Sequence, residues 1–347
     1  MHTLYTLTDE SMIGHTRRGL KSLCEQYKFD SIKEKAAVVV IELATNGIKH
    51  AKDSMIIVKT IETKKGIEIV YMDKGPGFDV EKSMQDGFSA GGSLGIGLGS
   101  IKRLSDECYI YSEKQKATFI VCRFYENNTT SVPPALQMLS KQRFIYSTIC
   151  VPLIGEEFCG DTVAVHCNDD FALCMIADGL GHGEYAYKAS TIAAEVFFDN
   201  VTKEPHEILS RIDHALYSTR GASASIAKII PEKNEVVYAG IGNIAGAIVG
   251  EKRVNMVSHN GTLGMHNSTI HTFTYPWSNN ALCIMHSDGI SSRWMLTDYP
   301  NIFAQDLSII AAVLFNEYHR PKDDSSLLIL KENQYNAIPF TNSTNIV

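Results

Sequence analysis

The stretch GFSAGGSLGIGLGSIKRLSDE, residues 87–107, decides how the first half of this chain is interpreted. Six of its first thirteen residues are glycines, and it continues into helix-like text. Glycine loses more backbone freedom on folding than any other residue, so the cluster indicates a loop that something approaches closely. The spacing fits neither the P-loop, which needs a following Gly-Lys-Ser/Thr, nor the dinucleotide fingerprint, which follows a strand directly. Taken alone, the cluster is equally well explained by a flexible surface loop.

Two polar residues lie upstream of this loop, in a segment expected to be a largely buried helix over 33–51. Glu42 and Asn46 are four residues apart, so they share one face of that helix. They need partners there, because unpaired burial costs about 1–3 kcal/mol for each group. A glutamate can act as a general base, and an asparagine oxygen suits a hard cation such as Mg²⁺.

A third feature, Asp73-Lys-Gly75-Pro-Gly77, follows an apolar strand. As an isolated motif it is most simply a turn. In the order Glu42–Asn46, Asp73–Gly77 and glycine loop, however, the three form a constellation. The loop leads into a helix N-terminus, whose partial positive charge and free N–H groups favour phosphate.

In this order the residues resemble the Bergerat (GHKL) ATPase fold, an α/β sandwich. The segments ELATNGIKHA, DKGPGF and DGFSAGGSLGIGLGSIKRLSDE resemble more closely the anti-sigma-factor serine kinases of the RsbT-like switch type, over about residues 5–125. The resemblance implies binding of ATP with Mg²⁺. It implies that Asn46 holds the Mg²⁺, that Glu42 takes the proton from an attacking serine hydroxyl, and that Asp73 accepts from the adenine amino group.

The same resemblance implies roles for the glycines, which make room for the nucleotide. The base would pass Gly75 and Gly77, and the phosphates would be covered by Gly95, Gly97 and Gly99. Lys102 and Arg103, expected in the first turn of the following helix, are candidates for phosphate contact or for a solvated helix face.

The second half of the chain places acidic motifs beside hydrophobic strands: Asp161, Asp178-Gly179, Asp288-Gly289 and Asp323-Asp324. Any one of these is ordinarily a turn. If they converge, their charges repel one another, and divalent cations are the physical solution. Hard oxygen ligands favour Mg²⁺ or Mn²⁺ over zinc. Two such ions, about 3.5–4 Å apart, activate a water for attack on a phosphoryl group.

This series, together with YAGIGN (238–243) and HSDGISSRW (286–294), resembles the SpoIIE/RsbX branch of the type 2C metal-dependent serine/threonine protein phosphatases. The resemblance covers about residues 141–331 and implies an α-β-β-α sandwich that binds two Mn²⁺ or Mg²⁺ ions. It implies that these are ligated by Asp161, Asp178, the Gly179 carbonyl, Asp288 and Asp323, with Asp178 also counted as catalytic.

For three further residues, the resemblance does not decide a single role. Asp324 would be an orienting group, and the choice between it and Asp323 as ligand stays open. His182 would be an acid, a phosphate contact or a structural residue of its loop. Cys159 stands where the family often has glycine, and its thiol would make the activity sensitive to oxidation.

The segment ENNTTSVPPALQ, 126–137, has linker composition and divides the chain. We expect an α/β (α+β) protein with an ATP-binding domain over 1–127, a linker over 128–140, a phosphatase domain over 141–331 and a tail over 332–347. The first domain is expected to run helix–strand–strand–loop–helix–strand–strand. The second is expected to be rich in strands, with helices around 184–200, 205–219 and 302–318.

The composition excludes several other functions. The net charge of −7 gives no general affinity for nucleic acid or acidic membrane surfaces. The longest apolar runs, at 36–41 and 309–315, are too short to span a bilayer, and the N-terminus has no signal-peptide pattern. Four of the eight cysteines, Cys150, Cys159, Cys167 and Cys174, have a spacing that predicts buried thiols rather than zinc ligands, in a reducing cytoplasm.

Together these features indicate a cytoplasmic bacterial partner-switching regulator. Its phosphatase half would dephosphorylate a STAS-type antagonist of an anti-sigma factor. Its first half would be a serine kinase for the same or a related partner, an ATP sensor that gates the phosphatase, or a module that sequesters a sigma factor or anti-sigma factor. No nucleic-acid or membrane partner is expected, and a homodimer is left open.

Overall fold

The computed structural model describes residues 2–61, 64–80, 96–126, 142–265 and 270–333. It confirms a mixed α/β fold. The chain divides into two compact units: Met1–Thr129 with Arg293–His319, and Thr130–Ser292 with Arg320–Val347. The predicted linker over 128–140 and nearly all of the predicted tail over 332–347 lie outside the described residues.

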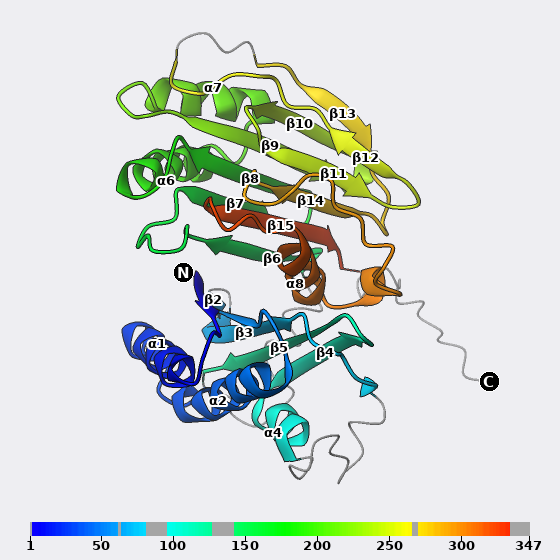
Figure 1. The fold of residues 1–347 in the computed structure, drawn as a ribbon. Coiled ribbons are helices and arrows are strands. Elements are labelled where there is room, and N and C mark those ends of the chain that lie inside the picture. Colours follow the sequence, from blue (N-terminus) through cyan, green and yellow to red (C-terminus); the bar gives the residue numbers. More distant parts are fainter. Residues whose placement is uncertain (1, 62–63, 81–95, 127–141, 266–269, 334–347) are drawn as a thin grey trace, which may run out of the picture. The chain divides into compact units, whose positions relative to one another are not determined.

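The first unit is built on one antiparallel sheet with the strand order β1-β2-β3-β5-β4. Figure 1 shows helices α1, α2 and α4 along one face of this sheet. They pack there through a core that includes Leu20, Leu43, Ile69 and Phe124. The elements are β1 (His2–Thr6), α1 (Ser11–Tyr27), α2 (Lys33–His50), β2 (Met55–Ile61), β3 (Gly66–Asp73), α4 (Ile96–Leu104), β4 (Glu107–Glu113) and β5 (Ala117–Tyr125).

Two of these elements, β1 and α1, were not predicted from the sequence. Helix α1 is amphipathic and mostly polar, and it buries only Thr16, Leu20, Leu23 and Cys24. Strand β1 is short, and it pairs with β2 at the edge of the sheet. Both depend on contacts with later parts of the chain, which local patterns do not reveal.

The first unit also contains a segment from the second half of the sequence, Arg293–His319, which we call the docked segment. It carries a short 3₁₀ helix, η3 (Ile302–Ala304), and helix α8 (Leu307–Tyr318), which contacts β3, β4 and β5. Within this unit, Figure 1 shows α8 on the face opposite α2 and α4. The sequence placed these residues in the phosphatase domain over 141–331, whereas their contacts group them with the first unit. The physical reason is that α8 is apolar all round and buried at ten consecutive positions, so it needs more cover than a surface helix.

The second unit is a sandwich of two antiparallel sheets, with strand orders β13-β10-β9-β8-β7 and β12-β11-β14-β15-β6. Side chains from both sheets form the core between them, among them Cys174, Tyr238, Met285 and Leu328. Helices α6 and α7 cover the outer face of the first sheet through a second core.

The sheet strands are β6 (Phe144–Val151), β7 (Asp161–Cys167), β8 (Ala172–Gly179), β9 (Ala222–Ile230), β10 (Glu235–Ile241), β11 (Ala245–Val249), β12 (Arg253–Met256), β13 (Phe273–Pro276), β14 (Leu282–His286) and β15 (Ser325–Glu332). The helices are α6 (Glu184–Asp199) and α7 (Pro205–Ala215), with a 3₁₀ turn, η2 (Pro231–Lys233). Both α6 and α7 agree with the predicted helices.

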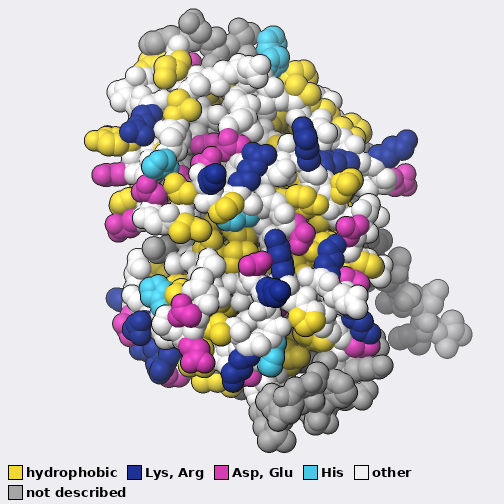
Figure 2. Space-filling view, viewed as in Figure 1, with side chains coloured by type: hydrophobic (Ala, Val, Ile, Leu, Met, Phe, Trp, Pro, Cys, Tyr) yellow, Lys and Arg dark blue, Asp and Glu magenta, His cyan; other side chains and the backbone are white. Residues whose placement is uncertain are grey.

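The surface agrees with the composition, but of Cys150, Cys159, Cys167 and Cys174, which were predicted to be buried thiols, only Cys174 is buried. On the described part of the face in Figure 2, basic and acidic side chains are interspersed rather than gathered into one basic area. Among the described residues, no helix has both the length and the apolar character needed to cross a membrane. All eight cysteines are free thiols.

Candidate functional sites

The predicted general base and magnesium ligand lie on helix α2. Glu42 and Asn46 are both half-buried and are one helical turn apart. Helix α4 begins beside them, because a Cβ atom added to Gly97 would collide with Glu42 Oε1 and would lie 3.7 Å from Asn46 Nδ2. Glycine at position 97 therefore leaves room for the Glu42 carboxylate. Gly95 lies outside the described residues.

Asp73 ends strand β3 in a buried, fully hydrogen-bonded position. Its Oδ2 accepts from the Tyr71 hydroxyl at 2.6 Å, and its Oδ1 accepts from the Gly75 and Thr118 amides at 2.7 and 3.2 Å. Burial raises the pKa of Asp73, and these hydrogen bonds oppose that rise. The carboxylate is thus held rigidly at the end of the central strand.

The two glycines after Asp73 are required by close approach of the backbone. Gly77 has φ +57°, and a side chain there would collide with the Glu113 carbonyl. A Cβ at Gly75 would lie 2.9 Å from Asp73 Oδ1. The backbone therefore turns tightly beside the carboxylate.

Lys102 and Arg103 were expected in the first turn of the helix that follows the glycine loop, and the bounds of α4 correct this. Both residues lie in the last turn of α4, not in its first turn, and both are exposed. Arg103 donates to the Ser100 hydroxyl at 3.0 Å. They are therefore part of a solvated helix end and are not at the helix N-terminus, where phosphate would be favoured.

In the second unit, the first two predicted metal ligands face each other across a strand pair. Asp161 begins β7, Asp178 is the penultimate residue of β8, and the two are direct partners in the antiparallel register. Gly179 follows at a position where a side chain would collide with the Ala186 carbonyl of α6. Strand pairing alone thus brings these two carboxylates together.

The other aspartates come from the ends of β14 and β15, which are neighbours in the second sheet. Asp288 accepts from Asn243 Nδ2 at 2.7 Å. Asp324 is buried, and its Oδ1 accepts from the Leu153 amide at 2.8 Å, whereas Asp323 is only partly buried. The geometry favours Asp323 as the ligand and Asp324 as the residue that fixes the neighbouring loop.

The electrostatics show that these carboxylates are near one another. The pKa of Asp178 is raised by burial and by the negative charges of Asp161, Asp288, Asp323 and Asp324. The pKa of Asp161 is raised by burial, although a 2.6 Å hydrogen bond from the Ser287 hydroxyl opposes the rise. Such mutual repulsion is what bound cations relieve.

The donor set fits divalent cations by its chemistry, since it consists of hard carboxylate oxygens. Within the described part of the chain, no group of three or more His, Cys, Asp or Glu side chains is arranged closely enough to ligate one ion as it stands. The carboxylates therefore lie near one another, but their side chains are farther apart than the ligands of a single ion would be.

His182 pairs with Glu156 in the loop before β7, and Cys159 of that loop contacts Cys150 of β6. His182 Nδ1 lies 2.7 Å from Glu156 Oε1, and 59% of its side chain is exposed. This pair favours the structural interpretation of His182. The Cys159 and Cys150 sulfurs are 3.6 Å apart, and Cys150 Sγ also donates to the Asp161 carbonyl at 3.4 Å.

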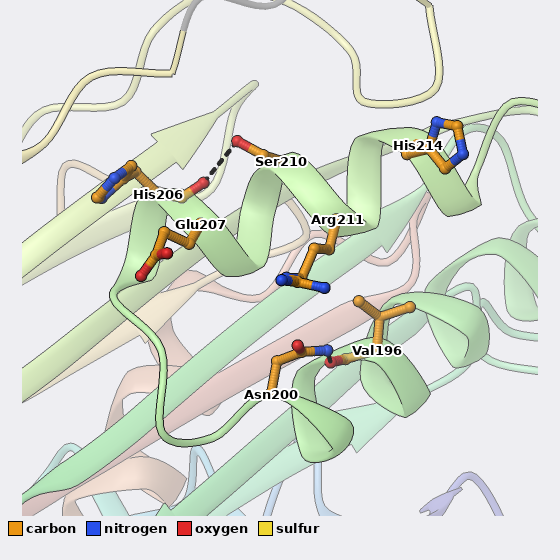
Figure 3. A pocket seen from close by; sticks show the side chains of 7 residues that line it. All are labelled: Val196, Asn200, His206, Glu207, Ser210, Arg211 and His214. Atoms are coloured by element: carbon orange, nitrogen blue, oxygen red, sulfur yellow. Dashed lines mark hydrogen bonds between the residues drawn. The ribbon is translucent and has the colours of Figure 1, made fainter.

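A separate cavity of about 600 Å³ lies between α6 and α7, and none of the predicted site residues lines it. Figure 3 shows its lining side chains projecting from both helices. It is lined by Val196, Asn200, His206, Glu207, Ser210, Arg211 and His214. The hydrogen bonds drawn there stay within each helix, as when Ser210 Oγ donates to the His206 carbonyl at 2.8 Å.

Three residues that orient the predicted site carboxylates were missed from the sequence: Ser287, Asn243 and Thr118. Ser287 and Asn243 lie inside the segments HSDGISSRW and YAGIGN, so the motif text contained them. Their roles as donors appear only when the fold brings the β10–β11 turn to Asp288 and the end of β14 to Asp161 at the start of β7. Thr118 acts through its backbone amide, which has no sequence signal.

Comparison with known proteins finds one family in each half of the sequence, and the second match includes the docked segment. Residues 7–123 match the histidine kinase-like ATPase domain family, and residues 168–332 match the stage II sporulation protein E (SpoIIE) family, a match that begins after Asp161. The chain belongs to the histidine kinase-like ATPase family through its first part, and its second part is similar to the SpoIIE family. The ATPase part is 34% identical over 118 residues to the serine/threonine-protein kinase RsbT of Bacillus subtilis, covering 33% of this chain and 88% of that protein.

The SpoIIE-type part has its own relative. It is 27% identical over 139 residues to the phosphoserine phosphatase RsbX of Bacillus subtilis, covering 40% of this chain and 70% of that protein. A solved structure from work on the bacterial stressosome shares the fold, with a TM-score of 0.52 and 21% identity, over 55% of this chain and all of that one. The chain therefore joins a histidine kinase-like ATPase domain to a region that matches the SpoIIE family.

Proposed function

We propose that the SpoIIE-type unit is a metal-dependent protein serine/threonine phosphatase. The observation that carries the proposal is that five aspartates from the ends of four strands converge, with Asp161 directly opposite Asp178 and the other four together raising the pKa of Asp178. Asp161, Asp178, Asp288 and Asp323, with the Gly179 carbonyl, would hold two Mn²⁺ or Mg²⁺ ions. When bound, such ions activate a water and neutralise charge on a phosphoryl group.

The chain's own residues prepare these ligands. Ser287 donates to Asp161 and also accepts from the Ser326 amide at 3.0 Å, so it ties β14 and β15 to the start of β7. Asn243 orients Asp288. Hydrogen bonds of this kind fix the direction of each carboxylate and strengthen metal binding.

We propose a phosphorylated STAS-type antagonist of an anti-sigma factor as the substrate. The support is the combination of an RsbX-like and an RsbT-like part in one chain, because those relatives are a phosphoserine phosphatase and a serine/threonine-protein kinase. A single small protein that cycles between phosphorylated and free serine would serve both parts. The setting would be bacterial partner switching in the cytoplasm.

The phosphatase proposal is tested with the variant Asp178→Asn. The full chain and the variant are mixed with a phosphoserine STAS protein and Mn²⁺, and released phosphate is measured. We expect loss of release in Asp178→Asn and parent-like release in Asp169→Asn, which replaces an exposed aspartate of the same unit. If Asp178→Asn releases phosphate as fast as the parent, the metal assignment is wrong.

For the ATPase unit we propose ATP-dependent phosphorylation of the same or a related partner. Gly97, the second residue of helix α4, lies directly beside Glu42, and this contact supports Glu42 as the base. Glu42 would take the proton of a serine hydroxyl as that oxygen bonds to the γ-phosphorus and ADP leaves. Asn46 would hold the Mg²⁺ of the nucleotide, and Asp73 would accept from the adenine amino group.

The kinase proposal is tested by incubating the chain with labelled ATP and an unphosphorylated STAS protein. We expect labelled product from the parent and from Glu10→Gln, an exposed glutamate before α1, but none from Glu42→Gln. ATP binding without any transfer by the parent would refute the kinase activity and favour an ATP sensor. Equal transfer by Glu42→Gln would remove Glu42 from its role.

A further inference from the structure

The docked segment, Arg293–His319, lies in the sequence between two of the proposed metal ligands, Asp288 and Asp323. Its ends are joined in the second unit, where the Arg320 amide donates to the Gly289 carbonyl at 2.8 Å. A side chain on Gly289 would collide with the Asp324 carbonyl, so the outgoing and returning chains are in close contact. Both ligands therefore flank the stem of a loop whose body belongs to the ATPase unit.

The stem is tied to these ligands directly. Arg320 Nη1 donates to the Asp288 carbonyl at 3.2 Å, and the Arg320 carbonyl accepts from the Asp323 amide at 3.4 Å. The relative placement of Asp288 and Asp323 thus depends on how residues 289 and 320 are held. That, in turn, depends on whether the loop body is fixed or free.

The loop body is fixed to the ATPase sheet by a buried ionic contact at the start of α8. Asp306 caps the helix by accepting from the Ser308 amide at 2.9 Å. Arg123 of β5 donates to both oxygens of Asp306, at 2.7 and 3.1 Å, and to Glu68 of β3 at 2.6 Å. The Ser308 hydroxyl donates to Glu68 at 3.1 Å. A bidentate arginine pair of this kind fixes direction as well as distance.

A second contact fixes the loop body near the proposed adenine site. Tyr299 packs against Phe119 of β5 and beneath Lys116, whose Nζ lies 3.9 Å from the ring centre. One residue before Phe119, the Thr118 amide donates to Asp73. The same strand therefore contacts the docked segment and the carboxylate proposed to bind adenine.

We infer that Arg123 is a positioning residue for the metal centre, acting by holding the docked segment whose stem carries Asp288 and Asp323. When the loop body is fixed, Asp288 and Asp323 are already ordered before a cation binds. Cation binding then costs less conformational entropy. Arg123 does not touch the ions or the substrate; it acts through Asp306 and the stem. The inference rests on the proposed function only in taking Asp288 and Asp323 as ligands.

The test measures Mn²⁺ binding to the full chain by calorimetry, without nucleotide, and hydrogen exchange of the α8 amides. The heat from the proposed centre is defined as the part lost in Asp178→Asn. We expect Arg123→Ala and Asp306→Asn to weaken this binding about tenfold and to speed exchange across α8. Arg123→Lys is expected to restore part of the affinity. Arg143→Ala is the matched control, since Arg143 also pairs with two glutamates but belongs to the second unit, and it should bind as the parent does.

The outcomes separate this inference from the proposed function. Faster exchange in α8 with parent-like Mn²⁺ affinity would refute the inference, because the segment would then be docked without effect on the centre. Circular dichroism shows whether Arg123→Ala is folded. If it is not, the Mn²⁺ affinity of Asp306→Asn alone tests the inference, because this variant leaves Arg123 paired with Glu68. Weakened Mn²⁺ binding in a chain that releases no phosphate would support the inference while refuting phosphatase activity.

Discussion

Acid is expected to weaken the ATPase unit through one buried glutamate. Glu68 on β3 is 3% exposed and pairs with Lys59 at 2.8 Å and with Arg123 at 2.6 Å. Burial alone would raise the pKa of Glu68, but the positive charges of Lys59 and Arg123 outweigh it and hold the pKa at about 2, against an ordinary 4.5. Because the folded pKa lies below the unfolded value, the ionised group stabilises the unit above pH 4.5, and this stabilisation is lost as the pH falls towards 2.

The magnitude follows from the two pKa values. The difference between 4.5 and about 2 corresponds to about 3 kcal/mol of unfolding free energy, of which about 2 kcal/mol is lost between pH 6 and pH 3. Other carboxylates titrate over the same range, so the parent must be compared with Glu68→Gln, which cannot titrate there. The variant is expected to be less stable than the parent at pH 6, with the gap closing by about 2 kcal/mol at pH 3.

Hydrogen exchange of the β3 amides, Gly66–Asp73, gives the opening free energy at each pH. Glu113→Gln, on strand β4 of the same sheet, is the matched control and should follow the parent. If the parent and Glu68→Gln lose the same stability between pH 6 and pH 3, the charges of Lys59 and Arg123 do not stabilise the folded unit as argued.

Two further substitutions test the sites themselves. In Gly97→Ala the new methyl group must displace the flexible Glu42 carboxylate. The free energy of unfolding should therefore change by less than about 1.5 kcal/mol, while the rate of phosphoryl transfer should fall at least about 100-fold. Transfer at the parent's rate would show that Glu42 is not the base. Ser287→Ala removes the donor to Asp161 and should raise the Mn²⁺ concentration for half-maximal phosphate release about 10–100-fold, and an unchanged Mn²⁺ dependence would contradict this role.

Much of the fold could be predicted because its signals are local. The apolar helix over 33–51, the strands ending at Asp73 and Asp178, and helices α6 and α7 all have clear periodicity or strand composition. The order of motifs then indicated which residues belong to one site. Pairing of β7 with β8 brings Asp161 opposite Asp178, a consequence of the sheet that motif spacing only suggests.

What could not be predicted depends on long-range packing. The text IIAAVLF at 309–315 predicts a buried helix, but nothing in it says which sheet will bury it. The decisive partner is Arg123, far away in the sequence, whose guanidinium pairs with Asp306. The prediction that Lys102 and Arg103 lie in the first turn of a helix was wrong for a smaller reason. Helix α4 begins at Ile96 and ends one residue after Arg103. A start a few residues later would have placed both in the first turn.

The proposal of metal-dependent dephosphorylation is tested most directly by one measurement on the full chain. Phosphate released from a phosphoserine STAS protein is followed with Mn²⁺, then with excess EDTA, and then after Mn²⁺ is restored. The five gathered aspartates predict release that stops with EDTA and resumes with Mn²⁺. Release that continues unchanged in EDTA, or no release under any of the three conditions, would contradict the proposal.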